Sequence, residues 1–247
     1  MPEEQLSQPF QPTTAEQPLV FACHPGVACF TECCRELDLA LSPYDVLRLK
    51  QHLQIPSERF LDQYVLIEQN NQQTFPTCYL TMVDDGRASC VFLRATGCSV
   101  YTDRPGSCRG YPIGRGAAWT KTSQAEQTLV LIQEPHCLGF AESTEPRTTA
   151  TYLASQGMEE YNRKNDLLLP LLQHRRIQSG QFRPSRHQHH QFLLALYDLD
   201  QFRRQMTAGH IALHRPLDAG HLRGLAGDDE ELLLLGIHWL LQEFFGE

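Results

Sequence analysis

The sequence lacks any long hydrophobic run, which argues against a membrane-spanning helix. Its longest aliphatic runs, such as residues 232–235, are far shorter than the roughly 20 apolar residues that cross a bilayer. It also lacks a basic excess, because the formal net charge is −8 and no basic run alternates with aromatic residues. We therefore expect no nucleic-acid partner and no membrane insertion. The sequence identifies no protein partner.

The first residues lack the basic start and apolar core of a secretory signal. Residues 1–20 are polar, acidic and rich in proline and glutamine, so we expect them to form a flexible leader. This composition favours a cytoplasmic location. Disulfides are rare in that compartment, and clustered cysteines there more often bind metal or react.

Cysteine is abundant. The 247 residues include nine cysteines, an odd number that rules out complete internal pairing, and 41% hydrophobic residues, enough for a core without disulfides. Eight of the cysteines fall into two groups, which are Cys23, Cys29, Cys33 and Cys34, and then Cys90, Cys98, Cys108 and Cys137.

Clustered thiols favour metal binding over the alternatives. Thiolates are preferred ligands of zinc and of iron–sulfur clusters, and four of them complete either site. Eight cysteines would make two such sites, or one site with some thiols left over, and the sequence leaves this division open. Disulfide or redox use and burial as free cysteine are the other interpretations, but four cysteines within twelve positions are not typical of core packing. Cys78, in a strand-like run, is better explained as a core residue.

Zinc and iron–sulfur are hard to separate by spacing. The chain lacks the CxxC pairs of a zinc ribbon and the ferredoxin spacing, and its irregular gaps fit a site assembled from separated loops. His24 and His136 beside cysteines are alternative ligands or ordinary loop residues. Four arginines near the second group either offset thiolate charge or are solvated loop residues; they are Arg94, Arg104, Arg109 and Arg115. Arg104 and Arg109 could also be structural, by satisfying buried carbonyls or by hydrogen-bonding toward sulfur.

Local patterns predict the elements around the cysteines. Ser42, Pro43 and Asp45 start a helix that ends before Pro56, and Ser57 begins the next. We expect strands over residues 75–83, 88–93 and 127–133, and an ordered loop over residues 102–116. Residues 148–178, 186–206 and 228–245 read as helical, with a loop over residues 207–227.

Three segments resemble the YkgJ-type cysteine-cluster family, a CxxCxxCC-type zinc- or iron-chelating domain. They are the group ending in Cys33-Cys34, the stretch from Cys90 through Cys98-Ser99-Val100-Tyr101 to Cys108-Arg109-Gly110-Tyr111-Pro112, and Glu134-Pro135-His136-Cys137-Leu138-Gly139. They span roughly residues 21–140. The resemblance implies that the eight clustered cysteines are the chelating set and that Cys78 is not. Cys23 departs most from the family spacing.

The family is also similar to iron–sulfur flagellin lysine methylases, which adds an enzyme hypothesis. However, the chain shows no glycine-rich nucleotide loop, no CxxxCxxC arrangement and no Ser/His/Asp or Cys/His catalytic signature. Catalytic residues therefore stay unassigned. A protein lysine methylase-like enzyme that depends on an iron–sulfur cluster is the alternative to a metal-binding module.

The sequence thus predicts an α+β metal-binding protein. A flexible leader (1–20) would precede a small cysteine-rich unit with short strands and two helices (21–147). A helical C-terminal region (148–247) would pack on that unit. We expect an iron–sulfur cluster ahead of zinc, held by Cys23, Cys29, Cys33, Cys34, Cys90, Cys98, Cys108 and Cys137.

Overall fold

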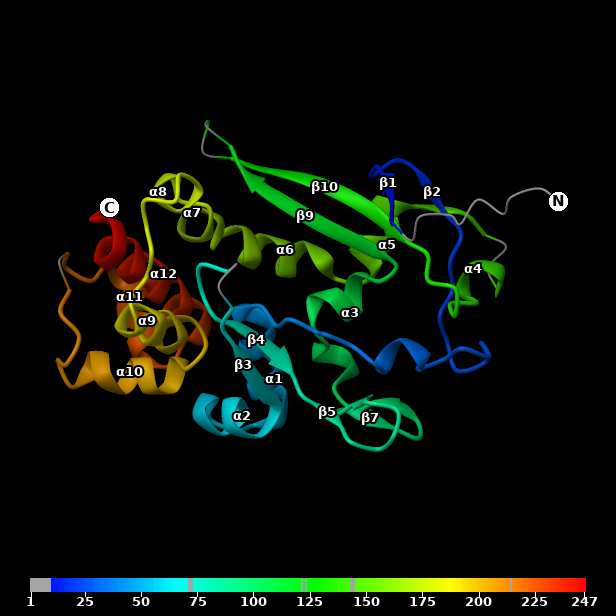
Figure 1. Ribbon diagram of the computed structural model, residues 1–247, viewed down its shortest axis with the longest axis horizontal. Coiled ribbons are helices and arrows are strands. Elements are labelled where there is room, and N and C mark those ends of the chain that lie inside the picture. Colours follow the sequence, from blue (N-terminus) through cyan, green and yellow to red (C-terminus); the bar gives the residue numbers. More distant parts are fainter. Residues whose placement is uncertain (1–9, 71–72, 121, 123, 143–144, 214) are drawn as a thin grey trace.

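The computed structural model describes residues 10–70, 73–120, 122, 124–142, 145–213 and 215–247. The fold is α+β, as predicted. Figure 1 shows the C-terminal helices at one end of an elongated molecule, a long antiparallel sheet along its upper side and short hairpins below. No helix in the described ranges has the length and apolar character needed to cross a membrane.

The main sheet has three antiparallel strands in the order β1-β10-β9. Its strands are β1 (Phe10–Thr13), β9 (Ile113–Trp119) and β10 (Ala125–Ile132). In the register, Phe10 faces Ile132 and Leu131 faces Ile113. The strand predicted over residues 127–133 is confirmed. Its partner β9 begins inside residues 102–116, which we predicted to be a loop. That part of the prediction is wrong. Gly114 and Gly116, which we took for loop residues, pair with Val130 and Thr128 of β10.

Four two-stranded sheets surround the cysteine segments. They pair β2 (Pro18–Leu19) with β11 (Arg147–Thr148), β3 (Val65–Glu68) with β4 (Thr77–Leu80), β5 (Met82–Val83) with β6 (Ser89–Cys90), and β7 (Leu93–Arg94) with β8 (Gly97–Cys98). The predicted hairpin around residues 84–86 is present as β5–β6, but it is short. The first of its predicted strands divides, and β4 instead pairs with β3.

The two helices expected near the N-terminus are confirmed. Helix α1 (Pro43–Leu53) starts at Ser42, whose side chain accepts a hydrogen bond from the Asp45 backbone while Asp45 binds the Ser42 backbone in return. Helix α2 (Ser57–Tyr64) follows directly. This capping box satisfies amides that the first turn leaves without partners.

Helices make up most of the rest of the chain. They are η1 (Glu32–Cys34), η2 (Tyr101–Asp103), α3 (Gly106–Gly110), α4 (Gly139–Glu142), α5 (Thr149–Ser155), α6 (Met158–Asp166), α7 (Leu169–Leu172), α8 (Arg175–Gln178), α9 (Arg186–Leu196), α10 (Leu199–Thr207), α11 (Ala219–Ala226) and α12 (Asp229–Phe245). The predicted helix over residues 186–206 is two helices. The predicted loop over residues 207–227 contains α11, whose start Asp218 caps.

The main core joins both parts of the chain. Buried side chains of α1 and α2 pack with those of α9, α10 and α12, and include Leu49, Phe60, Leu196 and Leu240. The Nζ of the buried Lys50 on α1 lies 2.7 Å from Asp229 on α12 and 3.1 Å from Asp200 on α10. Such a buried cation is tolerated because it has anionic partners, so α1 is held to the helical end by both apolar and ionic contacts.

The described part of the leader is paired rather than flexible. Residues 10–13 join the main sheet and residues 18–19 pair with residues 147–148. The expectation of a flexible leader is therefore wrong for these residues, and residues 1–9 lie outside the described ranges. The extended prolines in the segment are compatible with edge strands. The division of the chain at residues 20 and 147 stays a prediction.

The contact between α9 and α12 predicts a sensitive position at Gly236. A Cβ there would lie 2.3 Å from the Ala195 carbonyl oxygen. We expect Gly236→Ala to lower the free energy of unfolding by about 1–3 kcal/mol, despite alanine's better helix propensity, because two backbones must separate. Denaturant unfolding would measure this. Gly116→Ala is the control, since its Cβ meets only one backbone atom, at 4.0 Å. Equal stability of the two variants would contradict the close approach.

Candidate metal centre

The first cysteine group lies on a chain of tight turns. The amides of Val27, Phe30 and Glu32 bond to carbonyls three residues earlier, and the Cys34 amide bonds to the Thr31 carbonyl. Thr31 has a left-handed backbone conformation, with φ of 72°. Because short turns bring side chains separated by several residues back to one side, this segment presents several thiols within a small volume.

An aromatic cluster anchors the start of this segment. Phe21 is buried and packs its ring against Tyr111, Phe140 and Tyr152, with centroids 5.2–6.1 Å apart. The next residue donates its amide to the Gly139 carbonyl at 3.0 Å. These contacts bring the segment that carries Cys23 beside the end of β10, which carries Cys137.

Four cysteines of the predicted set line one narrow cavity. Cys23, Cys29 and Cys33 come from the turns, and Cys137 comes from the segment after β10. The cavity measures about 20 Å³, which is room for about one water-sized body. The Leu138 amide donates to the Cys29 Sγ at 3.1 Å, a hydrogen bond that strengthens when the sulfur carries negative charge.

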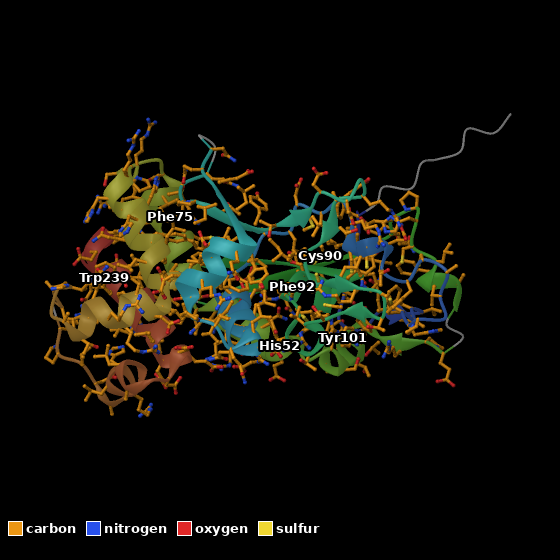
Figure 2. All side chains as sticks on the ribbon, turned by 90° about the horizontal axis from the view of Figure 1, so that it is seen from below. His52, Phe75, Cys90, Phe92, Tyr101 and Trp239 are labelled. Atoms are coloured by element: carbon orange, nitrogen blue, oxygen red, sulfur yellow. The ribbon has the colours of Figure 1, made fainter. Side chains whose placement is uncertain are left out.

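The second group is carried by two hairpins and a short helix. Cys90 lies in β6 opposite Met82, Cys98 lies in β8 opposite Leu93, and Cys108 lies in α3. Phe92, just after Cys90, is buried and packs its ring against Tyr64 at 5.2 Å. This contact fixes the hairpins to α2. Figure 2 shows Cys90 and Phe92 midway along the molecule, with Phe75 and Trp239 at the helical end.

The two groups meet at Cys33. Cys33 contributes to raising the pKa of Cys23, of Cys98 and of Cys108. It therefore lies close to thiols of both groups. Nearby, Gly97 lies against the ring of Phe30, so that a Cβ there would be 3.3 Å from Phe30 Cζ. The turns of the first group therefore pack directly on the β7–β8 hairpin of the second.

Most of the thiols are held in the neutral form when no metal is bound. Burial, followed by the nearby Cys33, Cys29 and Cys137, raises the pKa of Cys23 to about 11. A hydrogen bond with Cys34, and then burial, raises the pKa of Cys33 far above its usual range. Crowding of thiols in this way disfavours several simultaneous thiolates, unless a cation is added.

The second group behaves in the same way. Burial is the main cause that raises the pKa of both Cys90 and Cys98, and Cys98 also acts on Cys90. Loss of hydration and the neighbouring Cys90 and Cys33 raise the pKa of Cys108, although part of its surface is exposed. A bound metal ion would reverse this balance, because it stabilises the thiolate form.

Tyr111 was not among our predicted site residues, although it lies within the motif from Cys108 to Pro112. Its side chain lines the narrow cavity, and burial and the neighbouring Cys137 raise its pKa. Its hydroxyl is buried and has no hydrogen-bond partner among the described residues. A buried hydroxyl without an acceptor is costly. A metal-bound thiolate of Cys137 would supply one, so this site fits an anionic sulfur better than a neutral thiol.

The arginines near the second group contact backbone carbonyls. Arg104 donates to the Tyr101 carbonyl at 2.6 Å and to the Gln156 side chain at 2.7 Å. Arg109 donates to the carbonyls of Gln156 and Thr102. The interpretation that these side chains satisfy carbonyls is confirmed. Arg115 instead forms two 2.8 Å hydrogen bonds to Asp166 on α6.

The thiols are near one another but are not in coordination geometry. Within the described residues, no three His, Cys, Asp or Glu side chains form a preformed metal site. His136 lines the narrow cavity, whereas the His24 ring accepts the Gly26 amide. Cys78 is fully buried in the main core, as predicted. Metal binding would therefore need small shifts of the turns that carry the thiols.

The comparisons identify the domain in this part of the chain. Residues 22–138 match the CxxCxxCC family, described as a putative zinc- or iron-chelating domain. Over these residues the match confirms the resemblance found in the cysteine motifs, to a family whose domain is described as zinc- or iron-chelating. No match was found among curated proteins or among solved structures.

The close approach at Gly139 predicts a variant that disturbs the first group selectively. A Cβ there would lie 2.6 Å from the Phe21 ring and 2.7 Å from the Ala22 carbonyl oxygen. We expect Gly139→Ala to push the segment of Cys23 away from Cys137 and to weaken metal retention against a chelator by about tenfold. The exposed Ala141→Ser in the same helix is the control. Equal metal release from both variants would contradict this role.

The raised thiol pKa values predict proton release on metal binding. The clustered thiols with raised pKa values hold their protons at neutral pH without metal; they are Cys23, Cys33, Cys90, Cys98 and Cys108. Each of these thiols must lose its proton to ligate, so metal affinity should rise with pH. Without metal, the Cys23 contribution to stability is present below pH 9.0 and lost as the pH rises toward about 11. Titration calorimetry in two buffers of different ionisation enthalpy would count the protons. Metal binding without proton release would be inconsistent with thiolate ligation.

Proposed function

We propose that this protein holds metal through the thiolates of its eight clustered cysteines. The observation that carries the proposal is the narrow cavity, where thiols from residues 23–33 and from residue 137 face one another. Neutral thiols would contribute only the burial of small apolar side chains at this place. As ligands of one cation, the same thiols would cross-link residues 23–33 to residue 137, and the energy of metal binding would stabilise the fold.

We propose further that the adjacent cysteines divide between two sets of four. Cys33 lines the narrow cavity and Cys34 does not. The first set would be Cys23, Cys29, Cys33 and Cys137. The second set would be Cys34, Cys90, Cys98 and Cys108. Four thiolates complete a zinc or an iron site. Two adjacent side chains point in different directions from the backbone, so they can ligate different metals.

The Tyr111 hydroxyl near Cys137 and the Leu138 amide on the Cys29 Sγ support a thiolate-bound metal, because both can donate to an anionic sulfur. When bound, the metal would supply either a structural cross-link or electron transfer. An iron–sulfur cluster is our first choice because of the family resemblance and the irregular spacing. The small volume of the cavity favours a single ion in the first set, since a cluster would have to part the turns.

A reducing compartment would keep these thiols available, so we propose a cytoplasmic location. The odd number of cysteines and their clustering support it. The metal or cluster is the one partner that the site chemistry supports directly.

A methylase-like enzyme is the second candidate. The specific observation in its favour is a larger cavity of about 450 Å³, which borders Cys90 and has room for a small molecule. A metal with an incomplete ligand set at that edge would be open to a substrate.

Substitution of single cysteines tests the metal-binding proposal. We expect Cys33→Ala and Cys98→Ala each to lose about half of the bound metal, since each removes one ligand from one set of four. Cys78→Ala is the matched control, because Cys78 is fully buried in the core and lines neither cavity. Elemental analysis and visible absorbance of anaerobically purified protein provide the measurement.

The metal identity follows from the same samples. Iron with sulfide and a broad visible absorbance would mean a cluster, whereas colourless zinc would mean a structural ion. Wild-type protein without any metal would refute the proposal. Loss of metal from Cys78→Ala to the same extent would refute the assignment of ligands.

A further inference from the structure

We propose that the cavity beside Cys90 binds a small organic carboxylate with an apolar chain. We call it the arginine cavity, because Arg35 and Arg94 both line it; it measures about 450 Å³. This volume lies within the range of about 300–1,000 Å³ that is usual for small-molecule sites. This inference deepens the proposed function. It rests on that function in one respect, which is that Cys90 would bring a metal to the edge of the cavity.

The arginine cavity is built from both cysteine segments. Thr31 and Arg35 flank the Cys33-Cys34 pair, while Ser89 lies in β6 and Arg94 in β7, on the hairpins of the second group. An isolated antiparallel bridge joins Arg35 to Ser89. The two segments that line the cavity are therefore joined by backbone pairing as well as by side-chain contacts.

The charge in the arginine cavity is predominantly positive. Arg35 donates from Nη1 to the Thr31 carbonyl at 2.9 Å, and its Nε is buried without a hydrogen-bond partner among the described residues. Arg94 donates from Nη1 to the carbonyls of Val91 and Leu93. Neither arginine has a carboxylate among the ion pairs of the described residues, whereas the nearby Arg87 pairs with Glu32.

The one acidic side chain of the cavity is already engaged. The Oδ1 of Asp85 accepts hydrogen bonds from the amides of Arg87 at 3.0 Å and Ser89 at 3.2 Å. The Ser89 side chain, followed by the amides of Arg87 and Ser89, lowers the pKa of Asp85 by hydrogen bonding, and the two amide hydrogen bonds close the turn between β5 and β6. The carboxylate is thus used for the hairpin, and two guanidinium groups are left to meet a ligand.

The ligand class follows from the cations together with the apolar wall. A guanidinium presents parallel N–H groups that match a planar carboxylate. Val83, Val91 and Leu93 line the same cavity, and Val83 is 44% exposed. A fully ionic ligand such as phosphate would leave this apolar surface hydrated. A carboxylate that carries a branched aliphatic chain would use both parts of the cavity.

Equilibrium dialysis of radiolabelled isocaproate against the full-length protein tests this inference. We expect saturable binding, and Arg35→Gln and Arg94→Gln should each weaken it by at least about tenfold, because a charged hydrogen bond is lost. Arg87→Gln is the matched control, since this arginine lies in the turn between β5 and β6, near the cavity, but does not line it. Circular dichroism would verify that each variant is folded.

Competition with unlabelled compounds tests the ligand class. Isocaproamide, the neutral counterpart of isocaproate, should compete at least about tenfold more weakly, and acetate and phosphate should also compete more weakly. Unchanged binding by folded Arg35→Gln, equal competition by isocaproamide, or stronger competition by phosphate would overturn the inference.

Metal content measured on the same samples separates the two proposals. Metal-loaded protein that does not bind isocaproate would overturn the carboxylate site alone. Metal-free protein that binds isocaproate through Arg35 would refute the metal-binding proposal and support the carboxylate site.

Discussion

One buried carboxylate, that of Asp45, connects the helical core to the cysteine-bearing loops. It accepts hydrogen bonds from the Ser42 amide and hydroxyl, both at 2.8 Å, and from the Gly106 amide at 2.8 Å. The first two begin α1, and the third begins α3, which carries Cys108. Burial raises the pKa of Asp45 while these hydrogen bonds oppose the change. Since α1 belongs to the main core, the position of Cys108 is set by that core.

The first cysteine group is attached to a different, smaller core. Phe21 and Tyr152 belong to an apolar cluster beside the main sheet, and the Gly139 carbonyl holds the backbone after Phe21. Cys137 of the second group also packs on this smaller core, whereas Cys90 and Cys98 pack on the main core, and the cysteine segments meet at the Cys33-Cys34 turn. A metal that draws on both groups would join these cores. Its binding energy would then appear partly as stability of the whole chain.

Much of the local structure could be predicted from sequence, because it depends on nearby residues. The Ser42–Asp45 capping box and the strand near residue 127 are examples. The pairing of β3 with β4 and of β1 with β10 could not, since partners far apart in sequence are chosen by packing. At the site, the family motifs identified the eight cysteines. Their spacing did not predict which of them line the narrow cavity. The proximity of Cys33 to both groups emerges only when the turns pack on the hairpins.

The surroundings of the two sets differ in a way that bears on their chemistry. Cys23, Cys29, Cys33 and Cys137 border a cavity of about 20 Å³, and Cys90 borders one of about 450 Å³. A site with four protein ligands and no free volume suits a structural ion, whereas reactivity needs an open position. Exposed cations beside Cys90 would also attract an anion and offset thiolate charge. A reactive site in this protein would therefore lie beside Cys90. The thiols around the smaller cavity would then hold the turns next to that site.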